Sequence, residues 1–320
     1  MKYVDMHCDT ITSLYKTNGD LLHNDLHNDL NKMKDGECLL ENFAIFTDIA
    51  KEDSTFTRNS IDYYYSQLDK YSDLIRPVFR YEDIENNEKN GVISALLTLE
   101  EGSVIDNNLD NLNWFYDKGV RMITLTWNYA NGIGHPNFTY EEGEYHNRLY
   151  QINEKDGLTD FGIEYIRRMN ELGIIVDVSH LSDAGFYDVC RYSDRPFVAS
   201  HSNARSVCGV ARNLSDDMIR KLSDKGGVTG LNYCSAFIED HNEEYTTIDK
   251  MVEHIRHIVD VGGIDCVGLG SDFDGIGNKL EIKDASGLPL LYEALKKYYS
   301  EDEIEKIFYK NVLRVYREFF

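Results

Sequence analysis

The chain has only 4 prolines in 320 residues, and it contains no low-complexity stretch and no segment that resembles an interdomain linker. No apolar run approaches the roughly 18 residues of a membrane span. The first residues, Met1–Asp5, lack the apolar core of a signal peptide. We therefore expect one domain over residues 1–320, a cytoplasmic location and no membrane partner.

Cysteine pairs at metal-binding or redox spacing are also missing. The six cysteines are scattered, with no Cys-x-x-Cys motif, at Cys8, Cys38, Cys190, Cys208, Cys234 and Cys266. In a chain of this size the pattern is typical of reduced, mostly buried thiols rather than a disulfide framework.

Basic residues are scarce relative to acidic ones. Lys and Arg number 33 against 56 Asp and Glu, for a formal net charge of −23. Binding of phosphate backbones requires clustered Lys and Arg, and none occurs here, so nucleic acid is excluded as a partner. We expect most of the acidic charge to lie on a solvated surface.

The chain repeatedly alternates a short apolar run, a polar cluster and a segment with helical spacing. This alternation predicts βα units around a parallel sheet. The expected strands are Lys2–Met6, Phe43–Asp48, Val92–Leu99, Val120–Thr126, Gly173–Val178, Pro196–Ala199, Gly227–Asn232 and Cys266–Gly270. Eight strands and no second domain predict a (β/α)₈ barrel of the TIM type, with a doubly wound open sheet as the structural alternative.

Helix signals occupy the segments between these strands. Ser215 can cap a helix over Asp216–Lys225, and Ser300-x-x-Glu303 is a capping box that opens the last helix. Thr247 precedes a helix whose apolar face leaves His254 and His257 on the other side, so we expect these two histidines to be exposed.

Metal-binding residue types collect where the predicted strands end, which is where barrels carry their chemistry. Each of five strands ends in one or two such residues, namely His7 and Asp9, Glu100, His180, His201 and Asp272, and two further strands end in Asn128 and Asn232. Histidine and carboxylate ligands without thiolate suit zinc.

The spacing of these residues suggests two ions rather than one. His7 and Asp9 are two residues apart and can share one ion, whereas His180 and His201 close adjacent strands and can reach a second. Glu100 has two oxygens and can bridge the pair, and two ions with a shared water generate hydroxide at neutral pH. Asp272 is then left as a proton shuttle.

Nearly the whole chain resembles the membrane dipeptidase (renal dipeptidase) family of binuclear zinc peptidases. The densest similarity is carried by motifs at 156–160, 177–180, 199–207, 211–213 and 270–275, among them Asp177-Val-Ser-His180 and Ser271-Asp-Phe-Asp-Gly275, and it closes at 311–315. The match rests on several motifs that occur in order and at compatible spacing. The resemblance implies that His7, Asp9 and Glu100 bind one zinc and that Glu100, His180 and His201 bind the other. It also implies that Asp272 handles the proton of the attacking water and that Arg212 grips the terminal carboxylate of a dipeptide. Barrels of this family often pair, so a homodimer is a further expectation.

One departure from the family concerns the loop after the fourth strand. Many members carry a histidine there that helps to stabilise the tetrahedral intermediate, and this chain has Trp127 instead. Losing such a donor costs about 2.7–4 kcal/mol of transition-state stabilisation. Either Asn128, His135 or a metal ion compensates, or the activity is weaker or directed at another substrate.

The function that these features predict is therefore a zinc-dependent dipeptidase, with Trp127 and Asn128 as substrate-binding candidates. Two alternatives remain at this point. One is an amidohydrolase that acts on another small amide or lactam, and the other is a barrel that has kept its metals but works as a non-catalytic binding protein.

Overall fold

Eight parallel strands close into a barrel in the computed structural model, which describes residues 1–140, 148–242 and 244–320. The strands follow one another in the order β2-β1-β10-β8-β7-β6-β5-β4, and pairing of β2 with β4 closes the ring. They are β1 (Tyr3–Cys8), β2 (Cys38–Phe46), β4 (Ile93–Glu100), β5 (Val120–Thr124), β6 (Ile175–Asp177), β7 (Val198–Ala199), β8 (Val228–Leu231) and β10 (Val267–Leu269). The predicted barrel is confirmed, and the open sheet is excluded.

Three short strands lie outside this ring, and one strand of the ring begins earlier than predicted. A short strand, β3 (Ile75–Pro77), adds to the edge of β4, and β9 (Tyr245–Thr246) pairs with β11 (Lys279–Leu280) in a separate two-stranded sheet. The second barrel strand begins at Cys38 rather than at the predicted Phe43. Its early part was missed because the buried polar residues Glu41 and Asn42 interrupt the apolar pattern there.

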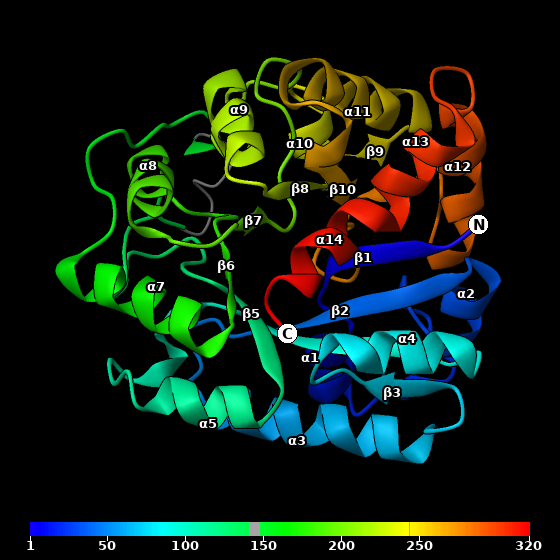
Figure 1. The fold of residues 1–320 in the computed structure, drawn as a ribbon, viewed down its shortest axis with the longest axis horizontal. Helices are drawn as coiled ribbons and strands as arrows, with labels where there is room; N and C mark the ends of the chain where they lie inside the picture. Colours follow the sequence, from blue (N-terminus) through cyan, green and yellow to red (C-terminus); the bar gives the residue numbers. More distant parts are fainter. Residues whose placement is uncertain (141–147, 243) are drawn as a thin grey trace.

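Helices surround the strands, as Figure 1 shows for α3, α5, α7, α8, α9 and α11. The described α-helices are α1 (Thr10–Thr17), α2 (Leu30–Asp35), α3 (Ser54–Lys70), α4 (Tyr81–Lys89), α5 (Asn111–Asp117), α7 (Asp160–Leu172), α8 (Asp183–Tyr192), α9 (Asp216–Asp224), α10 (Ser235–Ile238), α11 (Ile248–Gly262), α12 (Leu288–Leu295), α13 (Glu301–Glu305) and α14 (Asn311–Arg317). Short 3₁₀ turns occupy Gly102–Ile105, Ile264–Cys266 and Ala285–Gly287, and a π-helical turn, Lys306–Lys310, joins α13 to α14.

The predicted helix caps are present. The Ser215 side chain accepts a hydrogen bond from the Met218 amide at the start of α9. Ser300 and Glu303 form the predicted capping box of α13, which satisfies two amides that the helix leaves unpaired.

The prediction that His254 is exposed is wrong. The side chain is fully buried on α11; its Nδ1 lies 3.2 Å from the Ala204 amide and its Nε2 lies 2.8 Å from the Ile238 carbonyl. The amphipathic pattern located the core-facing stripe of the helix, but α10 and the loop around Ala204 cover its flank as well. Burial lowers the pKa of His254 to about 4, so the neutral ring suits its structural position.

The end of the barrel opposite the polar strand ends is filled by apolar side chains and closed by α14. This packing involves Val4, Met6, Leu40, Leu96, Met122, Ile175, Val198, Val228, Val312, Val315, Tyr316 and Phe319. The Asn42 amide donates a hydrogen bond to the Tyr316 hydroxyl within this core. A Cβ at Gly268 would lie 2.9 Å from Val312, so glycine in β10 permits the close approach of α14.

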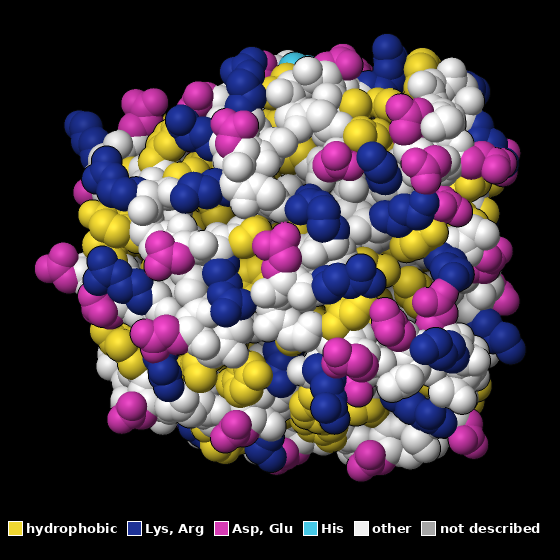
Figure 2. Space-filling view, viewed as in Figure 1, with side chains coloured by type: hydrophobic (Ala, Val, Ile, Leu, Met, Phe, Trp, Pro, Cys, Tyr) yellow, Lys and Arg dark blue, Asp and Glu magenta, His cyan; other side chains and the backbone are white. Residues whose placement is uncertain are grey.

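The surface has interspersed charges on the face seen in Figure 2, where Lys and Arg side chains lie among Asp and Glu and neither sign forms a continuous patch. All six cysteines are free, as the scattered spacing predicted. Within the described residues, no helix combines the length and the apolar character needed to cross a bilayer.

Truncation of the barrel floor should destabilise the fold. Tyr316→Ala removes a fully buried ring and should lower the free energy of unfolding in urea by about 3–5 kcal/mol. Tyr298→Ala is the matched control, because Tyr298 is 50% exposed and its ring lies against the guanidinium of Arg256. It should cost about 1 kcal/mol or less. Equal effects of the two substitutions would show that α14 does not close the barrel.

Candidate active site

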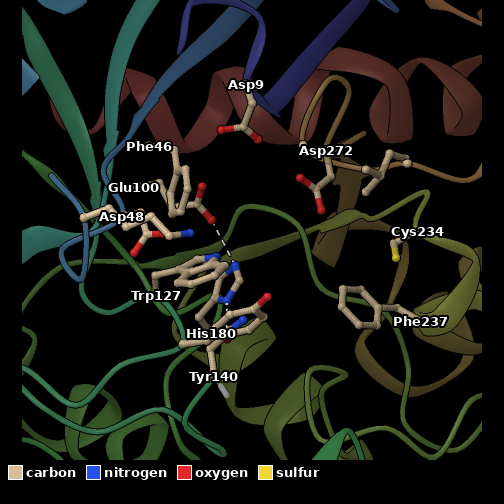
Figure 3. Close-up of a pocket in the computed structure, with 15 residues that line it drawn as sticks. Asp9, Phe46, Asp48, Glu100, Trp127, Tyr140, His180, Cys234, Phe237 and Asp272 are labelled. Carbon is tan, nitrogen blue, oxygen red and sulfur yellow. Dashed lines mark hydrogen bonds and ion pairs between the residues drawn. The ribbon is translucent and has the colours of Figure 1, made fainter. Parts of the chain in front are cut away.

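A cavity of about 550 Å³ opens at the carboxyl ends of the barrel strands. Its lining includes predicted metal ligands from three strands, Asp9, Glu100 and His180, and the acid Asp272 (Figure 3). Aromatic side chains cover part of the remaining wall. The cavity is therefore a polar centre with an apolar rim, the usual composition of a small-molecule site.

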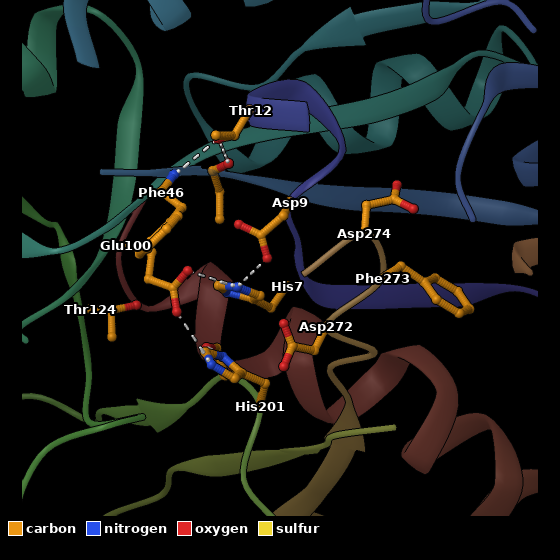
Figure 4. Close-up of polar contacts among 12 residues, drawn as sticks. His7, Asp9, Thr12, Phe46, Glu100, Thr124, His201, Asp272, Phe273 and Asp274 are labelled. Atoms are coloured by element: carbon orange, nitrogen blue, oxygen red, sulfur yellow. Dashed lines mark hydrogen bonds and ion pairs between the residues drawn. The ribbon is translucent and has the colours of Figure 1, made fainter. Parts of the chain in front are cut away.

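Glu100 lies at the centre of the predicted ligands and directs its two oxygens in different directions (Figure 4). Its Oε1 lies 3.0 Å from His180 Nε2 and 3.6 Å from His201 Nε2, and the two histidine nitrogens are 3.0 Å apart. These three atoms form a compact set. They match the second of the two ligand sets that the resemblance implied.

The other oxygen of Glu100 faces His7. Glu100 Oε2 lies 3.6 Å from His7 Nε2, which is also 3.5 Å from Asp9 Oδ2. This arrangement matches the first implied ligand set. Glu100 thus has one oxygen in each set, which is the position required of a bridging carboxylate.

His180 and His201, the histidine pair, are each oriented by a hydrogen bond at Nδ1, the ring nitrogen that points away from Glu100. Ser200 Oγ donates to Asp177 Oδ2 at 2.6 Å, and the same oxygen lies 2.7 Å from His201 Nδ1. Since the serine proton is given to Asp177, the His201 ring donates to the serine oxygen. The Nε2 atom of His201 then carries a lone pair.

Asn128 has the same role for His180. Its Oδ1 lies 2.8 Å from His180 Nδ1, so the His180 ring donates there and its Nε2 also carries a lone pair. Neutral imidazole with a fixed second nitrogen is the usual form of a metal-binding histidine.

The residues present fit divalent cations. Two imidazole lone pairs and a carboxylate oxygen converge within a buried space and repel one another unless a cation lies between them. His7 Nε2 and Asp9 Oδ1 are buried atoms that make no hydrogen bond within the described residues. Ligand atoms of His7, Glu100 and His201, and separately of His7, Asp9 and Asp272, lie within 4.8 Å of one another.

Burial has opposite effects on the acids and on the histidine pair. Burial raises the pKa of Glu100 to about 7 and that of Asp272 to about 6, and the nearby Asp9 carboxylate adds to both shifts. Burial, with the neighbouring Arg212 cation, lowers the pKa of His180 well below its usual range. A bound cation favours ionised carboxylates and neutral imidazole, so it would stabilise the ligand form of this cluster.

Asp272 projects into the cavity from the loop after β10. Its Oδ2 accepts a hydrogen bond from the Asn232 amide at 2.9 Å, which orients the carboxyl group. A Cβ at Gly275 would lie 2.2 Å from Asp9 Oδ2 and 2.5 Å from Asp272 Oδ1, so only glycine allows the chain to pass this close. Asp272 has a φ of 62° and His180 a φ of 70°, a left-handed conformation that costs free energy at a non-glycine residue.

Arg212 is buried beside the histidine pair. Its guanidinium lies 5.2 Å from the centre of the Phe237 ring, and one nitrogen lies 3.4 Å from Ser202 Oγ. Arg212 lowers the pKa of Asp272, after the larger effects of burial, His7, Asp9 and Asn232, so the two side chains are electrostatically coupled. From sequence alone, an arginine here is indistinguishable from a surface cation.

Trp127 lines the cavity, with its ring centre 6.2 Å from that of His180. Asn128 also lines the cavity, but its side-chain oxygen is engaged by His180. His135, the other residue considered as a replacement for the family histidine, has its Nδ1 3.1 Å from the Gly157 carbonyl. It is not among the residues that line the cavity.

Several site residues were not identified from the sequence. Ser200 directly precedes His201, and Asp177 lies three residues before His180. The proximity of each to a predicted metal ligand was the available signal. Asp48 ends the second predicted strand, yet it was not grouped with the other strand-end residues. Gly275 and Phe237 carried no signal of their own.

Comparison with known proteins agrees with this geometry. The family model described as membrane dipeptidase (peptidase family M19) matches residues 1–319. An uncharacterized dipeptidase of Schizosaccharomyces pombe is 32% identical over 308 residues, which cover 91% of this chain and 72% of that protein. A solved structure of the dipeptidase AC, a metallopeptidase of family M19, superposes with a TM-score of 0.91 at 26% identity, covering 100% of this chain and 98% of the other.

A second solved structure carries a ligand. A metallopeptidase of Rhodobacter sphaeroides, crystallised with a phosphinate mimic of the dipeptide L-Ala-D-Ala, superposes with a TM-score of 0.88 at 25% identity. The match covers 100% of this chain and 99% of the other.

Loss of the hydrogen bond behind His201 should weaken metal binding. Ser200→Ala removes the acceptor for His201 Nδ1 and should lower the affinity for divalent metal about 10–100-fold, measured by competition with a chromogenic chelator. Ser206→Ala is the control, because that exposed serine bonds only to Asp216, away from the cavity. Unchanged affinity in Ser200→Ala would exclude this orienting role.

Proposed function

Since the chain belongs to the membrane dipeptidase family, peptidase family M19, and is a hydrolase acting on peptide bonds, we propose that it is a zinc-dependent dipeptidase. The observation that carries the proposal is the position of Glu100. This one carboxylate separates a His7–Asp9 set from a His180–His201 set inside a cavity of dipeptide size.

His7, Asp9 and Glu100 would hold one zinc ion, and Glu100, His180 and His201 would hold the other. Histidine and carboxylate donors without thiolate are ligands that zinc accepts readily. When bound, the ion pair would supply Lewis acidity that lowers the pKa of a water and polarises the scissile carbonyl.

Asp272 would act as the general base and acid. Its carboxyl group faces the same space as His7 and Asp9, which is where the attacking water would lie. The Asn232 amide holds one oxygen, which leaves the other to accept the proton of the attacking water and to return it to the leaving amine.

Arg212 would bind the terminal carboxylate of the substrate. A guanidinium fork suits a carboxylate, and burial strengthens the interaction. One nitrogen of Arg212 lies 3.5 Å from the His201 carbonyl, so we infer that a single residue spans the distance between the carboxylate and the bond that is cut. The site should therefore favour dipeptides, and the phosphinate dipeptide mimic bound to the Rhodobacter sphaeroides relative supports this substrate size.

The presence of Trp127 favours a second candidate function. It occupies the place of a histidine that the family uses, so an amidohydrolase acting on another small amide or lactam is the alternative. A substrate of that kind would not depend on Arg212 if it lacks a carboxylate.

The main test compares substrate lengths. Zinc-loaded enzyme should hydrolyse Ala-Ala, in the L,L or the L,D form, with a kcat/KM at least about tenfold higher than Ala-Ala-Ala, because the carboxylate anchor is one residue from the cut. Comparable rates on the dipeptide and the tripeptide would contradict the assigned geometry.

A second test concerns the assigned base. Asp272→Asn should lower kcat about 10²–10⁴-fold, because the amide cannot accept the proton of the attacking water. Full activity of Asp272→Asn would contradict the assignment.

A separate test concerns the anchor. Arg212→Ala should lower kcat/KM for Ala-Ala by about thirtyfold or more, mainly through KM, because it removes the partner of a desolvated carboxylate. The control substrate is the same dipeptide with its carboxylate converted to an amide, which should respond little. An equal response of both substrates would exclude carboxylate binding by Arg212 and favour the alternative.

A further inference from the structure

An aromatic wall lines the cavity on the side of Glu100 and Asp48, and the proposed mechanism does not use it. The wall is the cluster of Phe46, Trp127, Tyr129 and Tyr140, of which Phe46, Trp127 and Tyr140 line the cavity. Trp127 is its centre, with ring-centre distances of 4.9 Å to Phe46, 5.3 Å to Tyr129 and 5.4 Å to Tyr140. The three lining side chains are only partly buried, so part of each ring borders the cavity.

A carboxylate lies at this wall. Asp48 lines the cavity and is itself 7% exposed. Its Oδ1 accepts a hydrogen bond from the Ala50 amide at 3.2 Å, which fixes the side chain. Burial and the neighbouring Asp48 carboxylate raise the pKa of Tyr129, so the acid is in electrostatic contact with the aromatic wall.

The ion pair that Asp48 already makes is one that a ligand can replace. Lys51 Nζ lies 2.9 Å from Asp48 Oδ2, but the Lys51 side chain is 74% exposed. Only the Asp48 end of this pair is buried, and the exposed Lys51 ammonium keeps its contact with water. A cation from a substrate can therefore take the place of Lys51 at Asp48.

The wall lies across the cavity from the carboxylate anchor. Figure 3 shows Phe46, Asp48 and Trp127 on one side of Glu100 and His180, and Phe237, the ring that packs against Arg212, on the other. If the substrate carboxylate binds Arg212 and the scissile bond lies at Glu100, the N-terminal residue extends toward the wall. This step rests on the proposed function.

We propose that the aromatic wall and Asp48 form the subsite for the N-terminal side chain and that this subsite favours a cationic side chain, arginine or lysine. Aromatic faces attract a cation, and a guanidinium group stacks on them as well. Asp48 supplies the counter-charge at the end of the side chain.

The test uses dipeptides that differ only in the N-terminal residue. Zinc-loaded enzyme is assayed with Arg-Ala, Lys-Ala, Met-Ala and Glu-Ala, with the C-terminal alanine in one stereochemical form throughout. We expect kcat/KM for Arg-Ala and Lys-Ala to exceed that for Met-Ala about tenfold, and Glu-Ala to be the poorest.

Two variants assign the preference to this subsite. Asp48→Asn should lower the ratio of kcat/KM for Arg-Ala over Met-Ala about tenfold, whereas Lys51→Met should raise it about threefold by removing the competing cation. Lys51 is exposed, so this variant tests the proposal even if Asp48→Asn does not fold. Asp69→Asn makes the same charge change on exposed helix surface and should leave the ratio unaltered.

The outcomes separate this proposal from the one before it. Hydrolysis of Met-Ala and Arg-Ala at equal kcat/KM, or a preference for Glu-Ala, would overturn the cationic subsite and leave the dipeptidase proposal intact. An unchanged ratio in both Asp48→Asn and Lys51→Met would also overturn it. Absence of turnover with every dipeptide would overturn both proposals.

Discussion

Glu100 and the His180–His201 pair concentrate lone pairs and negative charge in a place from which water is largely removed. The Nε2 atoms of His180 and His201 face Glu100 without a proton, because the opposite ring nitrogens donate to Asn128 and Ser200. Burying these lone pairs and the Glu100 carboxylate without a compensating positive charge costs free energy. Removing one of these side chains would still leave the others buried and uncompensated. Bound cations would therefore stabilise the observed arrangement of Glu100, His180 and His201. The surrounding structure holds these side chains in position.

The barrel provides this support through its strand ends and through the residues behind them. Asp177 accepts hydrogen bonds from the Ser200 hydroxyl, the Ser200 amide and the Ser179 amide, so one buried carboxylate ties β6 to β7 beneath the histidine pair. His180 and Asp272 are held in left-handed backbone conformations that cost free energy. The packing of the surrounding barrel constrains the backbone at these two residues and so maintains these conformations.

Much of the site could be predicted because parallel barrel strands all end at one rim. Residues far apart in sequence, such as His7 and Asp272, were grouped on that basis, and the structure brings them together. The contribution of Arg212 depended on resemblance to a family, since nothing local distinguishes it from a surface arginine. The burial of His254 was predicted incorrectly, because helical periodicity describes one face of α11 and carries no information on which loops cover its flank. Glu41 concealed the start of β2 for a related reason: a buried charged residue looks like the end of an apolar run.

The arrangement of the strands has a consequence for folding. β1 carries His7, and Asp9 follows directly after it, yet β1 lies between β2 and β10, and Asp5 pairs with Leu269. The floor of the barrel includes α14 side chains that pack against Val4 and Met6. Closure of the ring and assembly of the predicted ligand sets therefore depend on contacts between residues far apart in the sequence. Contacts of this kind cost loop-closure entropy before they form, which predisposes the protein to slow folding.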